Sequence, residues 1–239
     1  MKDWLRANRK KIERDLSLSS ERRYFSPVFY AQYQVALPLM RHYIRGKTID
    51  LGCGNMPFRH LLADKVTTYH TLDLWPRSDE VTYVGNIQDM SMISDASYDS
   101  AICLEVLEHV PNPFRAAREI HRILKPGGVV IISVPHLSRL HDEPHDYFRF
   151  TIHGLRYLLE SVGFEVLEIR RKGGMLSFLG HQVSTLLLSA AWSVPGLRQI
   201  AWFLNKWLVT QLCYIMDNLF DLSGIFALGY VGVAQKPTS

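Results

Sequence analysis

The stretch Thr48-Ile-Asp-Leu-Gly-Cys-Gly54 decides the fold that this sequence predicts. Its first four residues have the character of a buried strand, and Gly52 and Gly54 end that strand in a turn where the backbone can approach a ligand. We expect a helix to open at Pro57. The N-terminus of that helix would favour an anionic group of the ligand. Asp73 ends the next apolar run, where its carboxylate can accept hydrogen bonds from both hydroxyls of a ribose. The spacing therefore predicts a nucleoside-binding edge of a sheet.

Short apolar runs alternate with helical patterns from Lys47 onward, which predicts a parallel sheet with right-handed crossovers. We expect residues 46–239 to form one α/β domain and residues 1–45 to form an N-terminal helical extension. The second helix of that extension, from Pro27, should be kinked or broken at Pro38. The expected strands are 48–51, 69–72, 81–84, 98–104, 129–134, 164–169 and 225–234, and the clearest helices are 112–124 and 151–161.

An apolar insertion at about residues 173–222 separates the last two expected strands. Between Gly173 and Met216 the only charged residues are Arg198 and Lys206. Because both strands belong to one sheet, the insertion must return to the side on which it starts, which excludes a single membrane span and leaves a helical hairpin or a surface-lying element. Four roles stay open: a buried cap, a lid over an apolar acceptor, a homodimer interface, and an element that enters a membrane surface beside the basic helix Lys2–Arg14.

Composition and charge narrow the class of protein. The chain has 239 residues, 47% of them apolar, with a net charge of +4, which excludes a disordered or collagen-like chain. The charge is uneven: residues 1–45 carry +6, residues 46–150 carry −4 and residues 151–239 carry +2. Because the excess of basic residues lies in the N-terminal helix and not beside the acidic ligand-binding half, we expect no nucleic-acid partner. Cys53, Cys103 and Cys213 predict reduced thiols and a cytoplasmic location, with a peripheral place at the inner face of the membrane as the alternative.

The ordered motifs resemble the class I S-adenosylmethionine-dependent methyltransferases, in particular the methyltransferase-11-like branch. The resemblance rests on residues 48–54, on Asp73, on the turn Gly85-Asn-Ile87 and on residues 98–109 and 124–128. It implies a Rossmann-like fold with a seven-stranded, mostly parallel sheet, helices on both faces and the insertion between strands six and seven. It also implies S-adenosylmethionine as cofactor and S-adenosylhomocysteine as product.

The same resemblance assigns the cofactor-binding residues. Asn86 departs from the family, in which this position is usually acidic, but its amide oxygen can still accept a hydrogen bond from adenine, with Asp89 as a substitute. Met56 replaces a glycine that is common in the family. The expected cofactor-binding residues are Asp50, Gly52, Cys53, Gly54, Asp73, Leu74, Asn86, Ile87, Leu104, Glu105 and His109.

The polar segment 136–151 follows the fifth strand, at the edge where an acceptor is expected. A neutral imidazole is the natural base near neutral pH, so we predict His141, His145 and Asp146 as catalytic residues. Asp146 could pair with His141 or with His136. The alternative is a polar loop that only closes over the cofactor, with Arg149 paired to a local carboxylate.

A metal site is not expected in this segment. Histidine and carboxylate together suit zinc or iron, but the spacing matches no fixed metal motif and methyl transfer needs no metal. We expect Thr151 to cap the helix that follows.

The expected function is methyl transfer (enzyme class 2.1.1) to an oxygen or nitrogen of a small-molecule or lipid-linked acceptor. Residues 145–151 resemble a segment of methyltransferases from polysaccharide and lipid-carrier pathways, which favours a lipid-like or glycan-lipid acceptor. One alternative is an NAD-dependent oxidoreductase, but Pro57 stands where the dinucleotide fingerprint has glycine. The other is a non-catalytic cofactor-binding protein at a membrane surface.

Overall fold

The computed structural model describes residues 2–17, 19–220 and 224–238. The chain divides into two compact units, which we call the sheet unit (Val35–Arg171 and Gly229–Ser239) and the helical unit (Met1–Gln34 and Lys172–Leu228). The helical unit therefore combines most of the expected N-terminal extension with the expected insertion, two segments that are far apart in the sequence.

A seven-stranded sheet organises the sheet unit, with the order β3-β2-β1-β4-β5-β7-β6. Neighbouring strands from β1 to β5 pair in parallel, and β7 pairs antiparallel to β5, so the expected mostly parallel sheet is confirmed. The order reverses between β1 and β4, which is where a doubly wound sheet opens a crevice at its carboxyl edge. The strands are β1 (Gly46–Leu51), β2 (Val66–Asp73), β3 (Tyr83–Val84), β4 (Tyr98–Leu104), β5 (Leu124–Pro135), β6 (Glu165–Lys172) and β7 (Gly229–Gln235).

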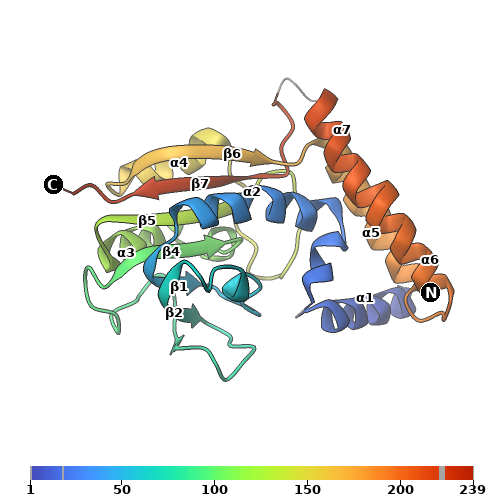
Figure 1. The fold of residues 1–239 in the computed structure, drawn as a ribbon, viewed down its shortest axis with the longest axis horizontal. Coiled ribbons are helices and arrows are strands. Elements are labelled where there is room, and N and C mark those ends of the chain that lie inside the picture. The colour runs from blue at the N-terminus through green and yellow to red at the C-terminus, as the bar shows by residue number, and fades with distance from the viewer. Residues whose placement is uncertain (1, 18, 221–223, 239) are drawn as a thin grey trace. The chain divides into compact units, whose positions relative to one another are not determined.

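Helices cover both faces of this sheet. Figure 1 shows α3 (Pro113–Ile123) and α4 (Ile152–Ser161) behind the strands, and residues 35–43 of α2 (Pro27–Tyr43) in front of them. The central strands are buried on both sides, which explains why residues 129–134 of β5 are apolar except for Ser133.

Polar caps set the helix starts that the sequence predicts. The Asn112 side chain accepts a hydrogen bond from the Arg115 amide at 3.0 Å before α3, whose first residue is Pro113. Thr151 caps α4 in the same way, accepting from the Gly154 amide at 2.9 Å, as the sequence predicts.

The expected helix at Pro57 is absent. A turn follows β1, and the segment then forms only a three-residue 3₁₀ helix, η2 (Arg59–Leu61). β2 already begins at Val66, so after the glycine turn too few residues remain for several helical turns. Phe58 and Leu62 are buried and fix this short connection in place. An anion site at a helix N-terminus is therefore not available here.

The expected break at Pro38 is also absent. α2 runs without interruption from Pro27 to Tyr43 with Pro38 inside it. Ala36, Leu39 and Met40 are buried around the proline, so packing outweighs the one backbone hydrogen bond that proline cannot donate. The third and seventh strands are shorter than expected, because β3 covers only Tyr83–Val84 and β7 begins at Gly229.

A helical hairpin dominates the helical unit, as the sequence predicts for the insertion. Its first arm is α5 (Met175–Ala191), and its second arm joins α6 (Leu197–Leu204), the π-helical segment η4 (Asn205–Gln211) and α7 (Leu212–Phe220). Figure 1 shows the two arms side by side. The expected end of the insertion, at about residue 222, lies outside the described residues. No described helix is both long enough and apolar enough to cross a membrane.

The N-terminal segment packs onto this hairpin. Ile12 and Leu16 of α1 (Lys2–Leu16) join Leu188, Ala191 and Trp192 in one buried cluster. The side-chain amide of Asn8 donates to the Ser189 backbone carbonyl at 2.8 Å, and the Trp192 indole N–H donates to the Asp15 carboxylate at 3.0 Å. The 3₁₀ helix η1 (Ser20–Tyr24) is held in turn by Asn205, which donates to the Tyr24 carbonyl at 2.8 Å.

Candidate active site

The glycine loop after β1 has the geometry that the sequence predicts. Gly52 and Gly54 have φ values of +69° and +51°, a region that favours glycine. A Cβ atom at Gly52 would lie 2.4 Å from Cγ2 of Val106, so a side chain is excluded there. A Cβ at Gly54 would meet nothing within 4 Å, so the loop borders open space at that point. Met56, with φ +50°, adopts the same left-handed region, which explains why glycine is common at this position in the family.

Asp73 stands beside this loop at the end of β2. Its Oδ2 accepts a hydrogen bond from the Gly54 amide and its Oδ1 from the Trp75 amide, both at 2.9 Å. These two bonds orient the carboxylate, and each oxygen keeps a further lone pair that a ribose hydroxyl can use. Leu74 lies between Asp73 and Trp75 in the chain, and its side chain is 43% exposed. The arrangement fits the predicted role of Asp73.

Asp50 lies buried beneath the same loop. The Tyr69 hydroxyl donates a hydrogen bond to it at 2.6 Å. Burial, opposed by the Tyr69 hydrogen bond and reinforced by the charge of Asp73, raises the pKa of Asp50 to about 6. A cationic group bound nearby would favour the ionised form. Cys53 is also buried, which raises the pKa of its thiol to about 12, so this residue contributes its backbone and volume and not a thiolate.

The expected adenine-contacting turn adjoins Asp73, because the Gly85 amide donates to the Asp73 carbonyl at 3.1 Å. The Asn86 side-chain oxygen accepts from the backbone and side-chain nitrogens of Gln88, at 2.9 and 3.3 Å, so it stabilises its own turn. Ile87 is buried within the turn. The Asp89 amide donates to the Asn86 carbonyl at 2.9 Å and so closes the same turn, while the Asp89 carboxylate accepts from the Ser91 amide at 3.3 Å.

Leu104 and Glu105 end β4 at the same edge. Glu105 has φ +54°, which is strained for a residue with a side chain. Its backbone amide donates to the Ser133 carbonyl at 3.0 Å, and its carboxylate accepts from the Ser133 hydroxyl at 2.6 Å. Ser133 of β5 therefore holds Glu105, the first residue after β4, in place.

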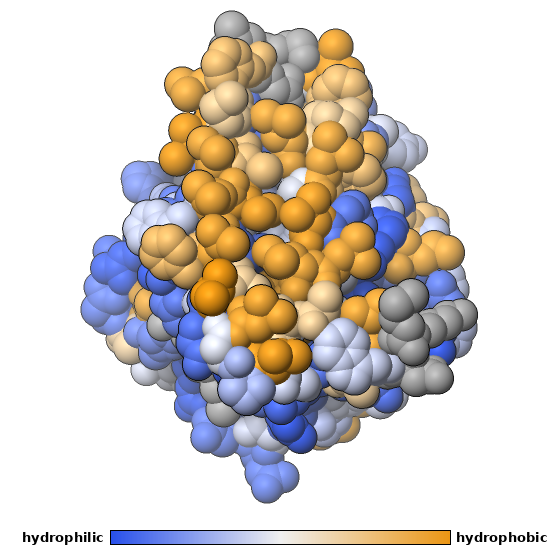
Figure 2. Space-filling model, turned by 90° about the vertical axis from the view of Figure 1, so that its right-hand side faces the viewer, coloured by the Kyte–Doolittle hydropathy of each residue, from blue (hydrophilic) through white to orange (hydrophobic). Residues whose placement is uncertain are grey.

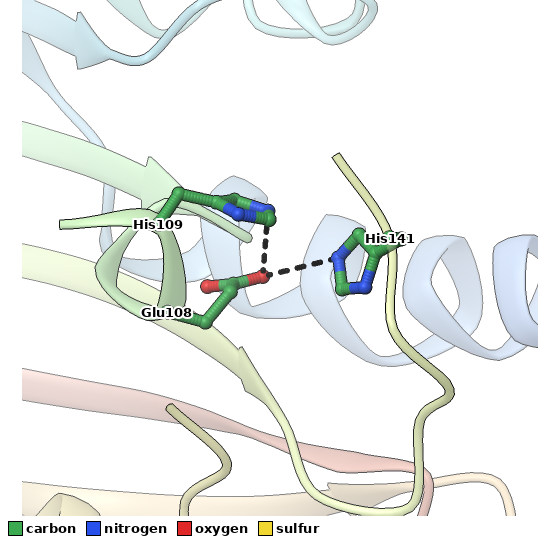
Figure 3. Close-up of side chains that lie close together, drawn as sticks. All are labelled: Glu108, His109 and His141. Atoms are coloured by element: carbon green, nitrogen blue, oxygen red, sulfur yellow. Dashed lines mark ion pairs between the residues drawn. The ribbon is translucent and has the colours of Figure 1, made fainter. Parts of the chain in front are cut away.

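A cluster of Glu108, His109 and His141 lies just beyond this point (Figure 3). Glu108 is fully buried in the short helix η3 (Leu107–His109). Its Oε1 lies 3.6 Å from Nε2 of His109 and 4.0 Å from Nε2 of His141, and the two rings are nearly perpendicular.

Backbone carbonyls select the tautomer of both rings. Nδ1 of His109 lies 2.6 Å from the His145 carbonyl, and Nδ1 of His141 lies 3.1 Å from the Arg139 carbonyl. Because a carbonyl only accepts, each Nδ1 carries a proton, and each ring turns its Nε2 toward Glu108. Two imidazole nitrogens and one carboxylate oxygen therefore converge on one point, an arrangement that suits a transferred proton and would also suit a divalent ion.

The cofactor-binding residues expected from the sequence include His109 but not its neighbour Glu108. The available signal was the pair Glu108-His109 directly after the fourth strand. The approach of His141, which the chain places 32 residues later, is set by the loop and has no sequence signature.

Asp146 and Arg149 fasten the polar segment 136–151. Arg149 donates to both Asp146 oxygens at 2.6 and 2.7 Å, which is the pairing expected in the polar-loop alternative, and holds the pKa of Asp146 far below its usual range. The His141 backbone amide donates to Asp146 at 2.9 Å, and the Nδ1 of His141 lies 3.5 Å away. Of the two candidate partners, His141 is therefore beside Asp146, whereas His136 lies against the ring of Tyr230.

His145 connects the polar segment 136–151 with Trp75, which follows β2. Its ring lies on the indole of Trp75 with centroids 5.2 Å apart, and its Nδ1 lies 3.2 Å from the Tyr147 hydroxyl. The Tyr147 amide donates to the Glu108 carbonyl at 2.8 Å. Trp75, which the sequence did not single out, is 61% exposed. The segment thus joins the Asp73 side of the edge to the Glu108 cluster.

Comparison with known families agrees with this geometry. Residues 49–132 match a family described as "Methyltransferase domain". This part of the chain is a class I methyltransferase domain of the methyltransferase-11 type. The resemblance inferred from the ordered motifs is confirmed, and the matched range covers β1 to β5 with the glycine loop, Asp73 and the Glu108-His109 pair.

Curated relatives carry methyltransferase names. The domain is 31% identical over 117 residues to a ubiquinone biosynthesis O-methyltransferase of Xanthomonas campestris pv. campestris, a match that covers 44% of this chain and 46% of that protein. It is 26% identical over 204 residues to a probable S-adenosylmethionine-dependent methyltransferase of Mycolicibacterium smegmatis, covering 72% of this chain and 77% of that one. The chain spans about half the length of the first of these relatives.

Solved structures confirm the fold. The 1,6-didemethyltoxoflavin-N1-methyltransferase of Burkholderia thailandensis, solved with bound 1,6-didemethyltoxoflavin and S-adenosylhomocysteine, superposes with a TM-score of 0.55 at 15% identity. The superposition covers 87% of this chain and 78% of that one. The expected Rossmann-like methyltransferase fold is therefore confirmed.

Proposed function

We propose that this methyltransferase domain transfers the methyl group of S-adenosylmethionine to an oxygen or nitrogen of an apolar or lipid-linked acceptor. The observation that carries the proposal is the carboxylate of Asp73, which two backbone amides orient at 2.9 Å beside the open space at Gly54. A vicinal diol is the group that such a carboxylate recognises, and the family uses one nucleoside cofactor.

The residues present fit that cofactor. Asp73 would hold the ribose hydroxyls, the turn at Asn86 and Ile87 would border the adenine, and the glycine loop above Asp50 would hold the amino-acid portion. When bound, S-adenosylmethionine supplies a methyl group on a sulfonium, which is a good and neutral leaving group. The protein must therefore supply alignment, exclusion of water and, for a hydroxyl acceptor, a place for the proton.

The Glu108 cluster provides that place. The Nε2 atoms of His109 and His141, which lie 3.6 and 4.0 Å from Oε1 of the buried Glu108, are the positions that would take the proton. The carboxylate would stabilise the imidazolium that forms. The predicted catalytic role of His141 remains a proposal, and we add His109 as the second candidate base.

The other two predicted catalytic residues have different roles in this proposal. Asp146, held ionised by Arg149, positions the backbone of His141 and does not accept the proton. His145 lies on Trp75, and together with Tyr147 and Phe148 it forms an aromatic border of exposed side chains. Such a border suits an apolar acceptor and excludes water around it. The name of the Xanthomonas campestris relative, a ubiquinone biosynthesis O-methyltransferase, supports a hydroxyl acceptor on an apolar molecule.

Transfer of a labelled methyl group tests the proposal. Purified protein incubated with S-adenosylmethionine labelled in the methyl group and with a lipid extract should move label into the lipid fraction. Asp73→Asn should abolish this transfer, whereas Arg156→Gln, which changes an exposed pair with Glu160 on α4, should not. Turnover that survives Asp73→Asn unchanged would contradict the assignment of the ribose site.

A further inference from the structure

The hairpin of the helical unit exposes a large apolar surface. Figure 2 shows this face, on which apolar side chains predominate along the two arms. Leu179, Val183 and Leu186 on α5, and Ile200, Leu208 and Ile215 on the second arm, are each at least half exposed. The spacings of four and three residues place the three α5 side chains along one stripe of that helix, and the three residues of the second arm follow one another across its π-helical segment. Exposed apolar patches of this extent mark interaction sites.

The same hairpin exposes no carboxylate. Over residues 173–220, all of which the structure describes, the only acidic residue is Asp217. Asp217 is 3% exposed, and it accepts hydrogen bonds from the amides of Gly174, Leu176 and Ser177 at 2.8–2.9 Å. The one acidic residue of the hairpin is therefore used at the N-terminus of α5. The two cations of the hairpin lie near carboxylates outside it: Lys206 is 3.0 Å from Glu21, and Arg198 is 3.7 Å from Asp15.

A cationic helix adjoins one end of this surface. α1 packs against the end of the hairpin where α5 leads into α6, and Arg6, Lys10 and Arg14 on α1 are exposed. Of the acidic side chains described on α1, Glu13 pairs with Arg9 at 3.4 Å, and Asp15 lies 3.7 Å from both Arg14 and Arg198. Positive charge therefore predominates beside the apolar stripe.

These features favour an anionic lipid surface over a second copy of the chain. A second copy would present the same cations and the same hairpin without an exposed carboxylate, so it offers no complementary charge. An anionic bilayer offers an apolar layer directly beneath a negative headgroup layer, which matches an apolar stripe with cations at one end. Because no described helix can cross a bilayer, the fitting geometry is an element that lies in the interface.

We propose that the α5–α7 hairpin docks in the interfacial layer of an anionic phospholipid bilayer, with the apolar stripe at the acyl boundary and the α1 cations at the phosphates. This proposal concerns the helical unit alone and stands whether or not the sheet unit transfers a methyl group. For a methyltransferase with a lipid-linked acceptor, such docking would bring the enzyme to its substrate.

Flotation with vesicles tests the docking. The full chain should float with vesicles of phosphatidylcholine containing phosphatidylglycerol, and binding should fall at least about tenfold in the double variant Ile200→Glu/Leu208→Glu. The triple variant Arg6→Glu/Lys10→Glu/Arg14→Glu should lose the preference for phosphatidylglycerol over pure phosphatidylcholine. Tyr157→Glu, an equally exposed change on α4 of the sheet unit, serves as the matched control and should float like the wild type.

Three further results would overturn the proposal. The first is a wild-type protein that does not float with anionic vesicles. The second is a concentration-dependent dimer that Ile200→Glu/Leu208→Glu dissociates while flotation is unchanged, because the surface would then be an interface between copies. The third is flotation of that double variant at the wild-type level. Circular dichroism confirms that each variant is folded, and titration with S-adenosylhomocysteine without vesicles reports the proposed cofactor site separately.

Discussion

Asp217, near the end of the hairpin, accepts a hydrogen bond at 2.8 Å from the backbone amide of Ser177, near its beginning. The same carboxylate also accepts from Gly174 and Leu176, so it satisfies three of the amides that the first turn of α5 leaves without a helical partner. A charge at this position also complements the helix dipole. One buried side chain thus joins the two arms of the hairpin across forty residues of sequence.

We predict that Asp217→Ala lowers the free energy of unfolding of the helical unit by about 2–3 kcal/mol, because it leaves buried amides without partners. Urea unfolding followed by tryptophan fluorescence checks this, since Trp192, Trp202 and Trp207 all lie in this unit. Asn218→Ala, at an exposed neighbouring position, should change stability by less than about 0.5 kcal/mol. Equal stability of the two variants would show that the carboxylate does not hold the hairpin together.

Asp50 predicts a pH dependence of cofactor binding. Its pKa of about 6 in the folded protein lies above the usual value, so the folded state takes up a proton at this site as the pH falls from 7 to 5. A cofactor that favours the ionised form must then bind more weakly at pH 5, by up to about tenfold per pH unit between the free and bound pKa values. Calorimetric titration with S-adenosylhomocysteine at several pH values measures this, and Asp50→Asn should flatten the profile. A profile that rises toward acid pH would show the opposite sign.

The raised pKa of Asp50 also affects stability. A carboxyl group with a raised folded-state pKa contributes fully below its unfolded value of 3.8 and loses that contribution as the pH rises through about 6. The side chain in Asp50→Asn is neutral at every pH, whereas buried Asp50 is ionised at pH 7. We therefore predict that the stability of Asp50→Asn minus that of the wild type is larger at pH 7 than at pH 4. Thermal unfolding at the two pH values checks the sign of the difference.

We predict that breaking the pair of Arg149 and Asp146 lowers activity without lowering cofactor affinity. Arg149→Met removes both hydrogen bonds to Asp146 and frees the loop that positions His141. We expect kcat/KM to fall by about 10- to 100-fold, since small displacements of a positioned group cost this much. The affinity for S-adenosylhomocysteine should stay within about twofold, because Asp73 and the glycine loop are untouched. An equal loss of binding and turnover would place Arg149 in the cofactor site.

Variants of His109 and His141, together with a chelator, distinguish a catalytic base from a metal site. His109→Gln and His141→Gln should each lower kcat by about 100- to 10,000-fold if the rings accept the acceptor's proton. Treatment with a chelator should leave wild-type activity unchanged, since the sequence predicts no metal. Activity that disappears on chelation and returns with a divalent ion would contradict that prediction and assign the Glu108 cluster to metal binding.

Local patterns in the sequence were sufficient for the sheet and its glycine loop. The apolar run at 98–104 coincides with β4, and the spacing of Gly54 and Asp73 brings them within 2.9 Å. These features depend on alternation and turn chemistry, which are properties of short segments. The missing helix at Pro57 shows the limit of that reasoning, because the short distance to β2 decides the outcome.

Long-range contacts explain what the sequence could not predict. Asn8 and Ser189 are 181 residues apart and share a hydrogen bond, yet neither segment carries a signal for the other. The approach of His141 to Glu108 and of His145 to Trp75 likewise depends on the path of an irregular loop. The apolar pattern and the pairing of the flanking strands left a hairpin or a surface-lying element for the insertion, and only the structure shows the hairpin and the burial of Asp217.

Titration of the wild-type protein with S-adenosylhomocysteine, in parallel with NAD, tests the central claim most directly. We predict saturable binding of S-adenosylhomocysteine that weakens by at least about tenfold in Asp73→Asn, and no saturable binding of NAD. Binding of NAD without binding of S-adenosylhomocysteine, or an affinity for S-adenosylhomocysteine that Asp73→Asn leaves unchanged, would contradict the assignment of this edge of the sheet as a methyl-donor site.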